Sequence, residues 1–212
     1  IYCLYFYIML MNNQEDNDKI YKYADYLIDK KQHRVNKYFK NIGINGENEM
    51  DEIIPNLYLG NYKAAYNLKK LKEKNIKNVV IICDNIETPF ENVGIKYFSI
   101  PIKDRELEED YFINGVEVNE YMISQLSKAI LFIFDCLRNN EGVLVHCKKG
   151  ASRSAYLVKY FLMLYNDYKS KEAEEFIKSK RPIAFPSYKN ISKYEKIIIP
   201  HKKLFKQYFN SY

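Results

Sequence analysis

The sequence contains no tryptophan, although it has 21 tyrosines, and it carries no nucleic-acid-binding motif. Tyrosines that stack on bases usually belong to a nucleic-acid-binding motif, so the many tyrosines here indicate a compositional bias. We therefore expect no nucleic-acid partner. Cysteines are also few: Cys3, Cys83, Cys136 and Cys147, with no C-x-x-C pair among them. Neither a zinc site nor a disulfide framework is predicted. This favours a reducing compartment, the cytoplasm or the nucleus, and no cofactor.

Long apolar runs are missing as well. The longest candidate, "IYCLYFYIMLM" at 1–11, is too short to span a bilayer. It also lacks the basic flank and the small-residue cleavage site of a signal peptide. We therefore expect no clear membrane span, and we expect this segment to pack on the domain. The alternative, that it is the end of a longer hydrophobic segment, stays open because the chain starts at Ile1.

The 212 residues are 47% hydrophobic and 28% charged, which is typical of one globular domain with a substantial core. The net charge of +6 would favour an anionic partner, but the lysines are widely spread and a solvated basic surface explains most of them. We expect an N-terminal extension at 1–50, a catalytic domain at 51–199 and a C-terminal tail at 200–212. In the extension, Asp18 can cap a helix over 19–40, followed by a polar linker.

The extension helix carries the basic run "DKKQHRV". This run could be a docking patch for an acidic partner, although a solvated helix face is the alternative. From residue 51 onward, apolar strands and amphipathic helices alternate. That order predicts an α/β fold, a central mostly parallel sheet flanked by helices, with the ligand at the carboxyl ends of the strands. The expected helices are 63–74 and 119–138, and the expected strands are 76–83, 95–102 and 142–145.

The most informative stretch is "GVLVHCKKGASRSAYLVKYFL" at 142–162. An apolar strand runs into a loop from Cys147 to Arg153, here called the cysteine loop, and a helical pattern follows. Loop N–H groups at a helix N-terminus bind anions, and they lower the pKa of a cysteine placed there. The guanidinium of Arg153 would add two hydrogen bonds and a permanent positive charge to the bound anion. A buried, inert cysteine is the ordinary alternative. The coincidence of strand, glycine, arginine and helix favours a nucleophile beneath a phosphate cradle.

The pattern H-C-x-x-G-x-S-R-S at 146–154 resembles the signature of the dual-specificity protein phosphatases, in the cysteine-based protein tyrosine phosphatase superfamily. Further stretches are similar to other parts of that family's domain, so the resemblance covers about 51–199 and implies its fold. These stretches are "IIPNLYLGNYKAAYN", "NVVIICDN", "IKYFSIPIKD" and "KEAEEFIKSKRPIAFPS".

The resemblance implies roles for individual residues. Cys147 would attack phosphorus, Arg153 would hold the phosphoryl oxygens, and Ser154 would stabilise the thiolate as it leaves. His146 would support the loop rather than act as a base. The phosphate-binding positions would be His146, Lys148, Lys149, Gly150, Ala151 and Ser152.

A general acid must protonate the leaving group, and the resemblance places Asp104 at that position. The separation of Asp104 from Cys147 is longer than the family usually needs. Asp110 and Glu106 therefore remain alternative acids.

The expected function is hydrolysis of phosphotyrosine and phosphoserine or phosphothreonine in proteins through a cysteinyl-phosphate intermediate, with no metal. Two alternatives remain: the same chemistry on a phosphoinositide, suggested by Lys148 and Lys149, or a catalytically weak phospho-binding module. Some lipid-acting relatives carry a resolving cysteine at the position that Cys83 matches. Cys83 is thus either a redox partner of Cys147 or a small buried residue.

Overall fold

The computed structural model describes residues 49–84, 87–102, 112–113, 116–185 and 192–211. The chain divides into two compact units, Ile1–Glu47 and Asn48–Tyr212, and the description below concerns the second. The expected extension helix and the first apolar segment lie outside the described residues. No helix within the described ranges is long and apolar enough to cross a membrane.

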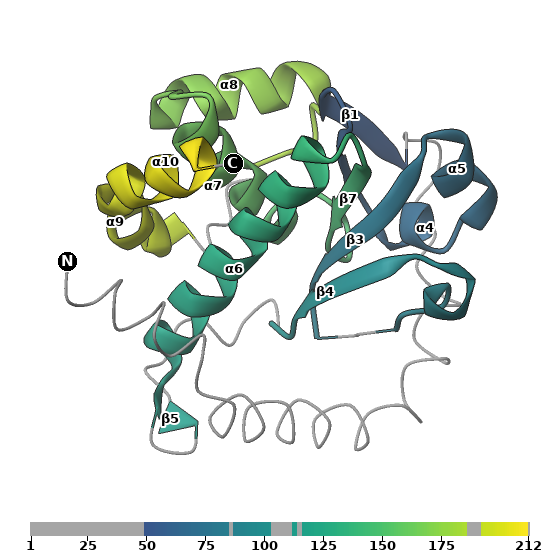
Figure 1. Ribbon diagram of the computed structural model, residues 1–212, viewed down its shortest axis with the longest axis horizontal. Helices are drawn as coiled ribbons and strands as arrows, with labels where there is room; N and C mark the ends of the chain where they lie inside the picture. Colours follow the sequence, from purple (N-terminus) through teal and green to yellow (C-terminus); the bar gives the residue numbers. More distant parts are fainter. Residues whose placement is uncertain (1–48, 85–86, 103–111, 114–115, 186–191, 212) are drawn as a thin grey trace. The chain divides into compact units, whose positions relative to one another are not determined.

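A five-stranded sheet with the order β1-β2-β7-β3-β4 forms the centre of this unit (Figure 1). Only the β1–β2 pair is antiparallel; β2, β7, β3 and β4 run parallel to one another. Parallel strands need both faces covered, which explains why every residue of β7 is buried. The strands are β1 (Met50–Ile54), β2 (Leu57–Gly60), β3 (Ile76–Ile82), β4 (Lys96–Ile100) and β7 (Gly142–His146). The mixed α/β class expected from the sequence is confirmed.

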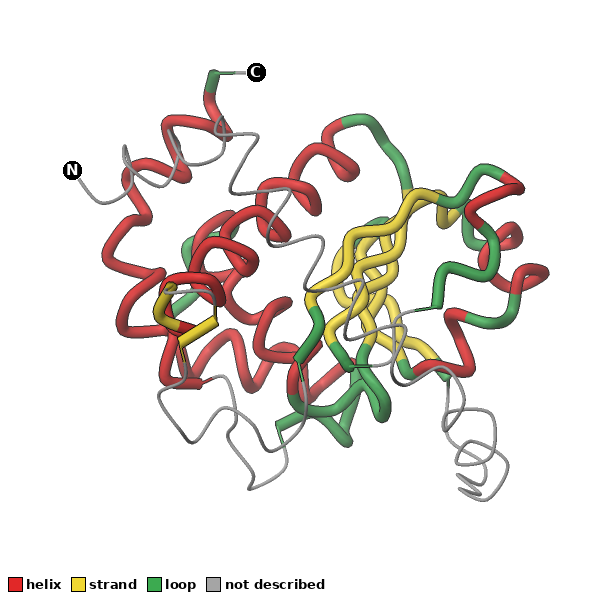
Figure 2. Tube along the Cα trace, turned by 90° about the horizontal axis from the view of Figure 1, so that it is seen from below, coloured by secondary structure: helices red, strands yellow, loops and turns green. Residues whose placement is uncertain are grey.

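Helices cover both faces of the sheet, as the turned view shows (Figure 2). Alternation along β3 divides the core: Val80 and Ile82 pack with the larger helical layer, whereas Val79 and Ile81 pack with the smaller one. The smaller layer contains α4 (Tyr62–Ala65) and α5 (Leu68–Glu73). The larger contains α6 (Val118–Arg138), α7 (Arg153–Tyr165), α8 (Ser170–Lys180), α9 (Glu195–Ile198) and α10 (Lys202–Asn210).

Short elements complete the described chain. A separate two-stranded sheet, β5 (Phe112–Ile113) with β6 (Val116–Glu117), precedes α6. Single 3-10 turns lie at η1 (Glu91–Val93), η2 (Ser192–Tyr194) and η3 (Ile199–His201).

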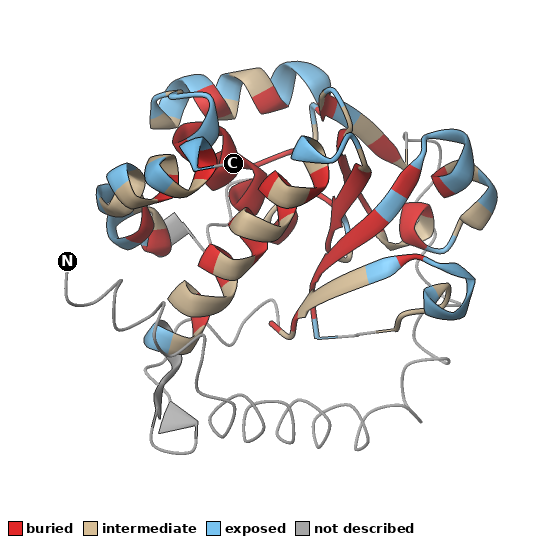
Figure 3. Cartoon of the chain, viewed as in Figure 1, coloured by how far each residue is buried: buried red, intermediate tan, exposed pale blue. Residues whose placement is uncertain are grey.

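Two segments differ from the sequence expectation. The helix expected over 63–74 is two short helices, because the side chains of Asn61 and Asn67 each accept an N–H bond and cap a separate helix start. The segment expected as a tail contains α10, whose buried Phe205 and Phe209 add to the core. Figure 3 shows the buried residues in red, for example along β3 and β7. The ring of Phe209 lies 4.5 Å from that of Phe134 on α6.

The strand register places the cysteine loop. β7 lies between β2 and β3, with His146 opposite Gly60 on one side and Ile81 on the other. Residue 147 therefore leaves the sheet at the middle of its carboxyl edge, between the ends of two neighbouring strands. This is the position where ligands bind in parallel α/β sheets.

Candidate active site

The cysteine loop curls around the sulfur of Cys147. The N–H of Gly150 donates to Cys147 Sγ at 3.3 Å, and the Ser154 hydroxyl donates to it at 3.2 Å. Cys147 itself is only 3% exposed. Ser152 is the N-cap residue of α7, so that helix begins at the loop and directs its first N–H groups toward it. The structure thus brings Cys147, Gly150 and Ser154 together.

These contacts change the acidity of the thiol. Burial pushes the pKa of Cys147 upward, but the charge of Arg153, the Ser154 hydroxyl and the N–H groups of Ser154 and Ala151 outweigh it. The net result is a pKa below the usual value for cysteine. A buried sulfur that is surrounded by donors and a cation is suited to be a thiolate nucleophile.

Arg153 connects the loop to the segment that follows β4. Its side chain is buried, and Nη1 donates to the carbonyl oxygen of Ile102 at 2.6 Å. Ile102 is followed two positions later by Asp104 in the sequence. Asp104, Glu106 and Asp110 all lie outside the described residues, so the general acid stays a prediction.

His146 is buried against the loop, and its Nδ1 lies 3.3 Å from the carbonyl oxygen of Cys147. Burial, together with the charge of Arg153, lowers the pKa of His146 to about 4. The ring is therefore neutral near pH 7, and because a carbonyl can only accept, Nδ1 carries the proton. This geometry suits a support for the loop and not a general base.

Gly150 is required by close packing. It has φ +65°, and a Cβ placed on it would lie 2.2 Å from the carbonyl oxygen of Gly60. Any side chain would push the loop away from the end of β2. Among its neighbours, Ala151 is buried, Lys148 and Ser152 are half-buried, and Lys149 is exposed.

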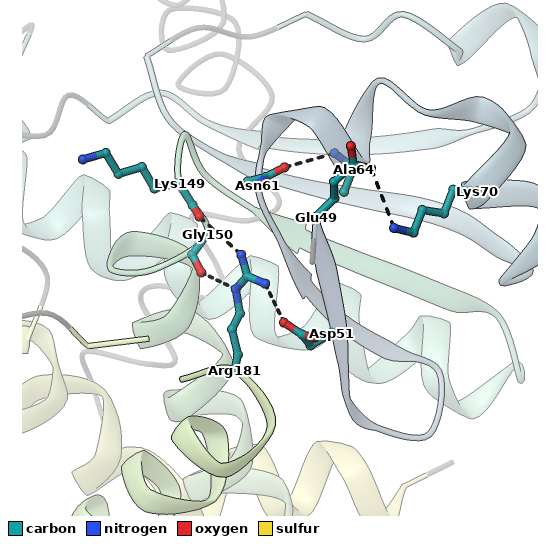
Figure 4. Close-up of polar contacts among 8 residues, drawn as sticks. All are labelled: Glu49, Asp51, Asn61, Ala64, Lys70, Lys149, Gly150 and Arg181. Atoms are coloured by element: carbon teal, nitrogen blue, oxygen red, sulfur yellow. Dashed lines mark hydrogen bonds and ion pairs between the residues drawn. The ribbon is translucent and has the colours of Figure 1, made fainter. Parts of the chain in front are cut away.

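Arg181, which the sequence analysis missed, lies behind the loop (Figure 4). Its Nε donates to Gly150 O at 2.7 Å, its Nη2 to Lys149 O at 3.4 Å, and its Nη1 to the Asp51 carboxylate at 2.6 Å. It is 1% exposed. The sequence offers one signal, an arginine directly before Pro182 at the end of α8, and that signal alone indicates a turn.

Cys83 follows the end of β3, the strand next to β7. It is 5% exposed and packs in the cluster on the α4 and α5 side of the sheet. Within the part of the chain that the structure describes, no cysteines are bonded to each other, and no group of three or more His, Cys, Asp or Glu residues could hold a metal.

Comparison with known proteins agrees with this geometry. The chain is 31% identical to dual specificity protein phosphatase 22 of Xenopus tropicalis over 140 residues, 66% of this chain and 60% of that protein. It is 34% identical to dual specificity protein phosphatase 6 of Homo sapiens over 139 residues, 65% and 33% of the two chains. The chain thus spans about three fifths of the length of the first relative.

Solved structures show the same fold. DUSP15 matches with a TM-score of 0.62 and 24% identity, over 78% of this chain and 97% of that one. Human DUSP28 matches with a TM-score of 0.58 and 20% identity, over 76% and 97%. The family model "Dual specificity phosphatase, catalytic domain" matches residues 57–197. These findings confirm the resemblance seen in the motif at 146–154: the chain belongs to the dual-specificity phosphatases of the cysteine-based protein tyrosine phosphatase superfamily.

Proposed function

We propose that the chain is a cysteine-dependent phosphatase that hydrolyses phosphotyrosine and phosphoserine or phosphothreonine in proteins. The observation that carries the proposal is the environment of Cys147 Sγ, which accepts bonds from Gly150 N–H and the Ser154 hydroxyl and has a lowered pKa. A sulfur stabilised as a thiolate at the floor of a loop of N–H groups can attack a bound phosphoryl group.

The first step forms the S–P bond to Cys147 and breaks the P–O bond to the substrate. Asp104 gives its proton to the leaving oxygen. The N–H groups of the loop and the fork of Arg153 hold the equatorial oxygens, whose charge grows in the transition state.

The second step is hydrolysis of the cysteinyl phosphate. Water attacks phosphorus and passes a proton to Asp104, now a carboxylate. The S–P bond breaks, and its electron pair returns to Cys147 as a thiolate. Ser154 lies where its hydroxyl can stabilise that thiolate as it leaves.

The test is a substrate panel of phosphotyrosine peptides, phosphothreonine peptides and phosphoinositide vesicles, with Cys147→Ser as the control. We expect the intact chain to turn over the peptides, and Cys147→Ser to lose turnover but still bind them through the loop amides and Arg153. Arg153→Lys should also be severely impaired, because a point charge cannot replace the planar fork. Turnover by Cys147→Ser would overturn the covalent mechanism.

The panel also separates the alternatives. Hydrolysis of phosphoinositide alone would replace the protein substrate with a lipid. PTPMT1 in complex with PI(5)P, a solved structure of the same fold at 20% identity and a TM-score of 0.54, makes that comparison relevant. Binding of phosphopeptides without any turnover would indicate a phospho-binding module.

We further propose that the basic run at 29–35 docks an acidic partner. The support is its charge alone, and the segment lies outside the described residues. Replacing Lys30, Lys31 and Arg34 with alanine should weaken binding to an acidic phosphopeptide substrate while hydrolysis of p-nitrophenyl phosphate stays unchanged. An equal effect on both substrates would refute docking.

A further inference from the structure

Five consecutive carbonyl oxygens of the cysteine loop, those of residues 147–151, accept hydrogen bonds from residues outside the loop. The five donor groups come from four residues. They are His146 Nδ1 to Cys147 O (3.3 Å), Tyr62 N to Lys148 O (3.5 Å), Arg181 Nη2 to Lys149 O (3.4 Å), Arg181 Nε to Gly150 O (2.7 Å) and Phe185 N to Ala151 O (2.8 Å).

A trans peptide is planar, so its C=O and the following N–H point in opposite directions. Arg181 binds the carbonyls of Lys149 and Gly150, and the N–H groups of those same peptides belong to Gly150 and Ala151. The Gly150 N–H donates to Cys147 Sγ, and the Ala151 N–H is among the groups that lower the pKa of Cys147. Arg181 therefore holds the outer ends of the peptides whose inner ends hold the sulfur.

The side chain of Arg181 is well fixed for this task. It is 1% exposed, and Asp51 on β1 binds its Nη1 at 2.6 Å (Figure 4). The guanidinium thus joins β1, the end of α8 and the cysteine loop. A cation at the carbonyl end of a peptide also polarises it, which strengthens donation by its N–H.

The turn after α8 adds a further contact. Phe185 has φ +54°, a conformation uncommon for a bulky residue, and its N–H bonds to Ala151 O. Its ring packs 5.1 Å from that of Tyr156 on α7, which fixes the turn against the helix that follows the loop. The segment from Arg181 to Phe185 therefore supplies the donors for three consecutive loop carbonyls.

We propose that Arg181, held by Asp51, is a positioning residue that orients the Gly150 and Ala151 N–H groups, and so stabilises the Cys147 thiolate and the bound phosphoryl oxyanion. The effect of Arg181 on catalysis rests on the proposed phosphatase function. The protonation state of the Cys147 thiol and the affinity for an oxyanion can be measured without turnover.

The central variant is Arg181→Met, which keeps the length of the side chain and removes its donors. Arg181→Lys keeps the charge but not the fork, and it serves if the methionine variant does not fold. The matched control is Lys159→Met. Lys159 is also a buried cation, 2% exposed on α7, and it pairs with Glu174 and Glu195 at 2.6 Å each, neither of which belongs to the cysteine loop.

The readouts are the pH dependence of Cys147 alkylation by iodoacetamide, followed by peptide mass mapping, and the affinity for orthovanadate. In Arg181→Met we expect the alkylation midpoint to move to higher pH and vanadate binding to weaken about 10- to 100-fold. Turnover of p-nitrophenyl phosphate, as kcat/KM, should fall about 10²-fold. Arg181→Lys should be impaired in the same direction.

The control separates positioning from general damage. Lys159→Met should lower the melting temperature and leave the alkylation midpoint and the vanadate affinity as in the parent chain. If Arg181→Met and Arg181→Lys both titrate and bind vanadate like Lys159→Met, the positioning role is overturned. If the parent chain hydrolyses nothing but its thiol titration still depends on Arg181, the positioning role stands and the proposed phosphatase function fails.

Discussion

The hydroxyl of Ser154 lies 3.2 Å from the sulfur of Cys147 and donates a hydrogen bond to it from the first turn of α7. A hydrogen bond to a charged acceptor contributes about 1.5–3 kcal/mol, and this one is most useful when the thiolate is expelled from phosphorus. Ser154→Ala should therefore slow hydrolysis of the cysteinyl phosphate by about 10- to 100-fold.

The measurement is stopped-flow release of p-nitrophenol. We expect a rapid burst followed by slow turnover, because the aryl group leaves in the first step and the intermediate accumulates. Loss of the burst together with turnover would show that Ser154 acts before the intermediate forms.

Alkylation should distinguish the described cysteines by their acidity. The pKa of Cys147 is lowered, whereas burial and the charge of Glu141 raise the pKa of Cys136 to about 12. At pH 7 the first is enriched in thiolate and the second is protonated. Iodoacetamide at pH 6–7 should therefore label Cys147 and inactivate the enzyme, while Cys136 stays unlabelled until the protein unfolds. Equal labelling in the folded protein, measured by mass spectrometry, would contradict the pKa order.

Gly150 and Gly94 allow backbone strain to be separated from steric conflict. Both have positive φ, +65° and +93°, but a Cβ at Gly94 meets nothing within 4 Å. Gly94→Ala should cost about 1–2 kcal/mol in the free energy of unfolding and keep activity. Gly150→Ala adds the conflict with Gly60 O, so it should lose vanadate binding and turnover as well. Urea unfolding and vanadate titration of both variants check this, and an active Gly150→Ala would show that the loop can shift without harm.

Asp104 is the predicted general acid. Asp104→Ala should reduce kcat by about 10²–10⁴-fold for a poor leaving group such as a phosphorylated alkyl alcohol. The loss should be much smaller for an activated phenol, which leaves without a proton, and the basic limb of the pH profile should flatten. Steady-state kinetics on both substrates, repeated with Asp110→Ala and Glu106→Ala, identifies the acid. An equal loss of kcat on both substrates in Asp104→Ala would show that Asp104 is not the general acid.

Cys83 is the predicted redox partner. It follows β3, the neighbour of β7, so the two strand ends lie at the same edge of the sheet. Mild peroxide should oxidise Cys147 to a sulfenic acid, which condenses with Cys83 to a disulfide and water, and a thiol reductant should restore activity. The bridge needs Cα atoms within roughly 7 Å, or movement of the loop to that range.

Peptide mapping of the oxidised protein without reductant checks the bridge, and Cys83→Ser is the matched variant. We expect Cys83→Ser to be inactivated irreversibly. A Cys147–Cys136 bridge, or Cys147 carried to sulfinic acid while Cys83 stays a thiol, would exclude this role for Cys83.

The sequence by itself determined the local parts of this protein. An apolar stretch at 142–145, a loop with glycine and arginine, and a helical pattern are all encoded within residues 142–162, so the order strand, cysteine loop, helix could be predicted. The alternation of apolar segments determined the α/β class for the same reason: periodicity is a property of neighbouring residues. The family resemblance also came from contiguous stretches of sequence, above all the motif at 146–154.

Only the tertiary structure decided which distant residues meet the loop. Arg181 binds Gly150 across 31 positions and Asp51 across 130, and no local pattern specifies such a meeting. The same holds for α10, where the ring of Phe209 packs against Phe134 on α6 and Tyr165 on α7. Contacts between residues far apart in the sequence depend on strand register and helix orientation. Interactions along the whole chain determine both. Those long-range contacts place donors behind the loop and thereby direct its N–H groups toward the sulfur.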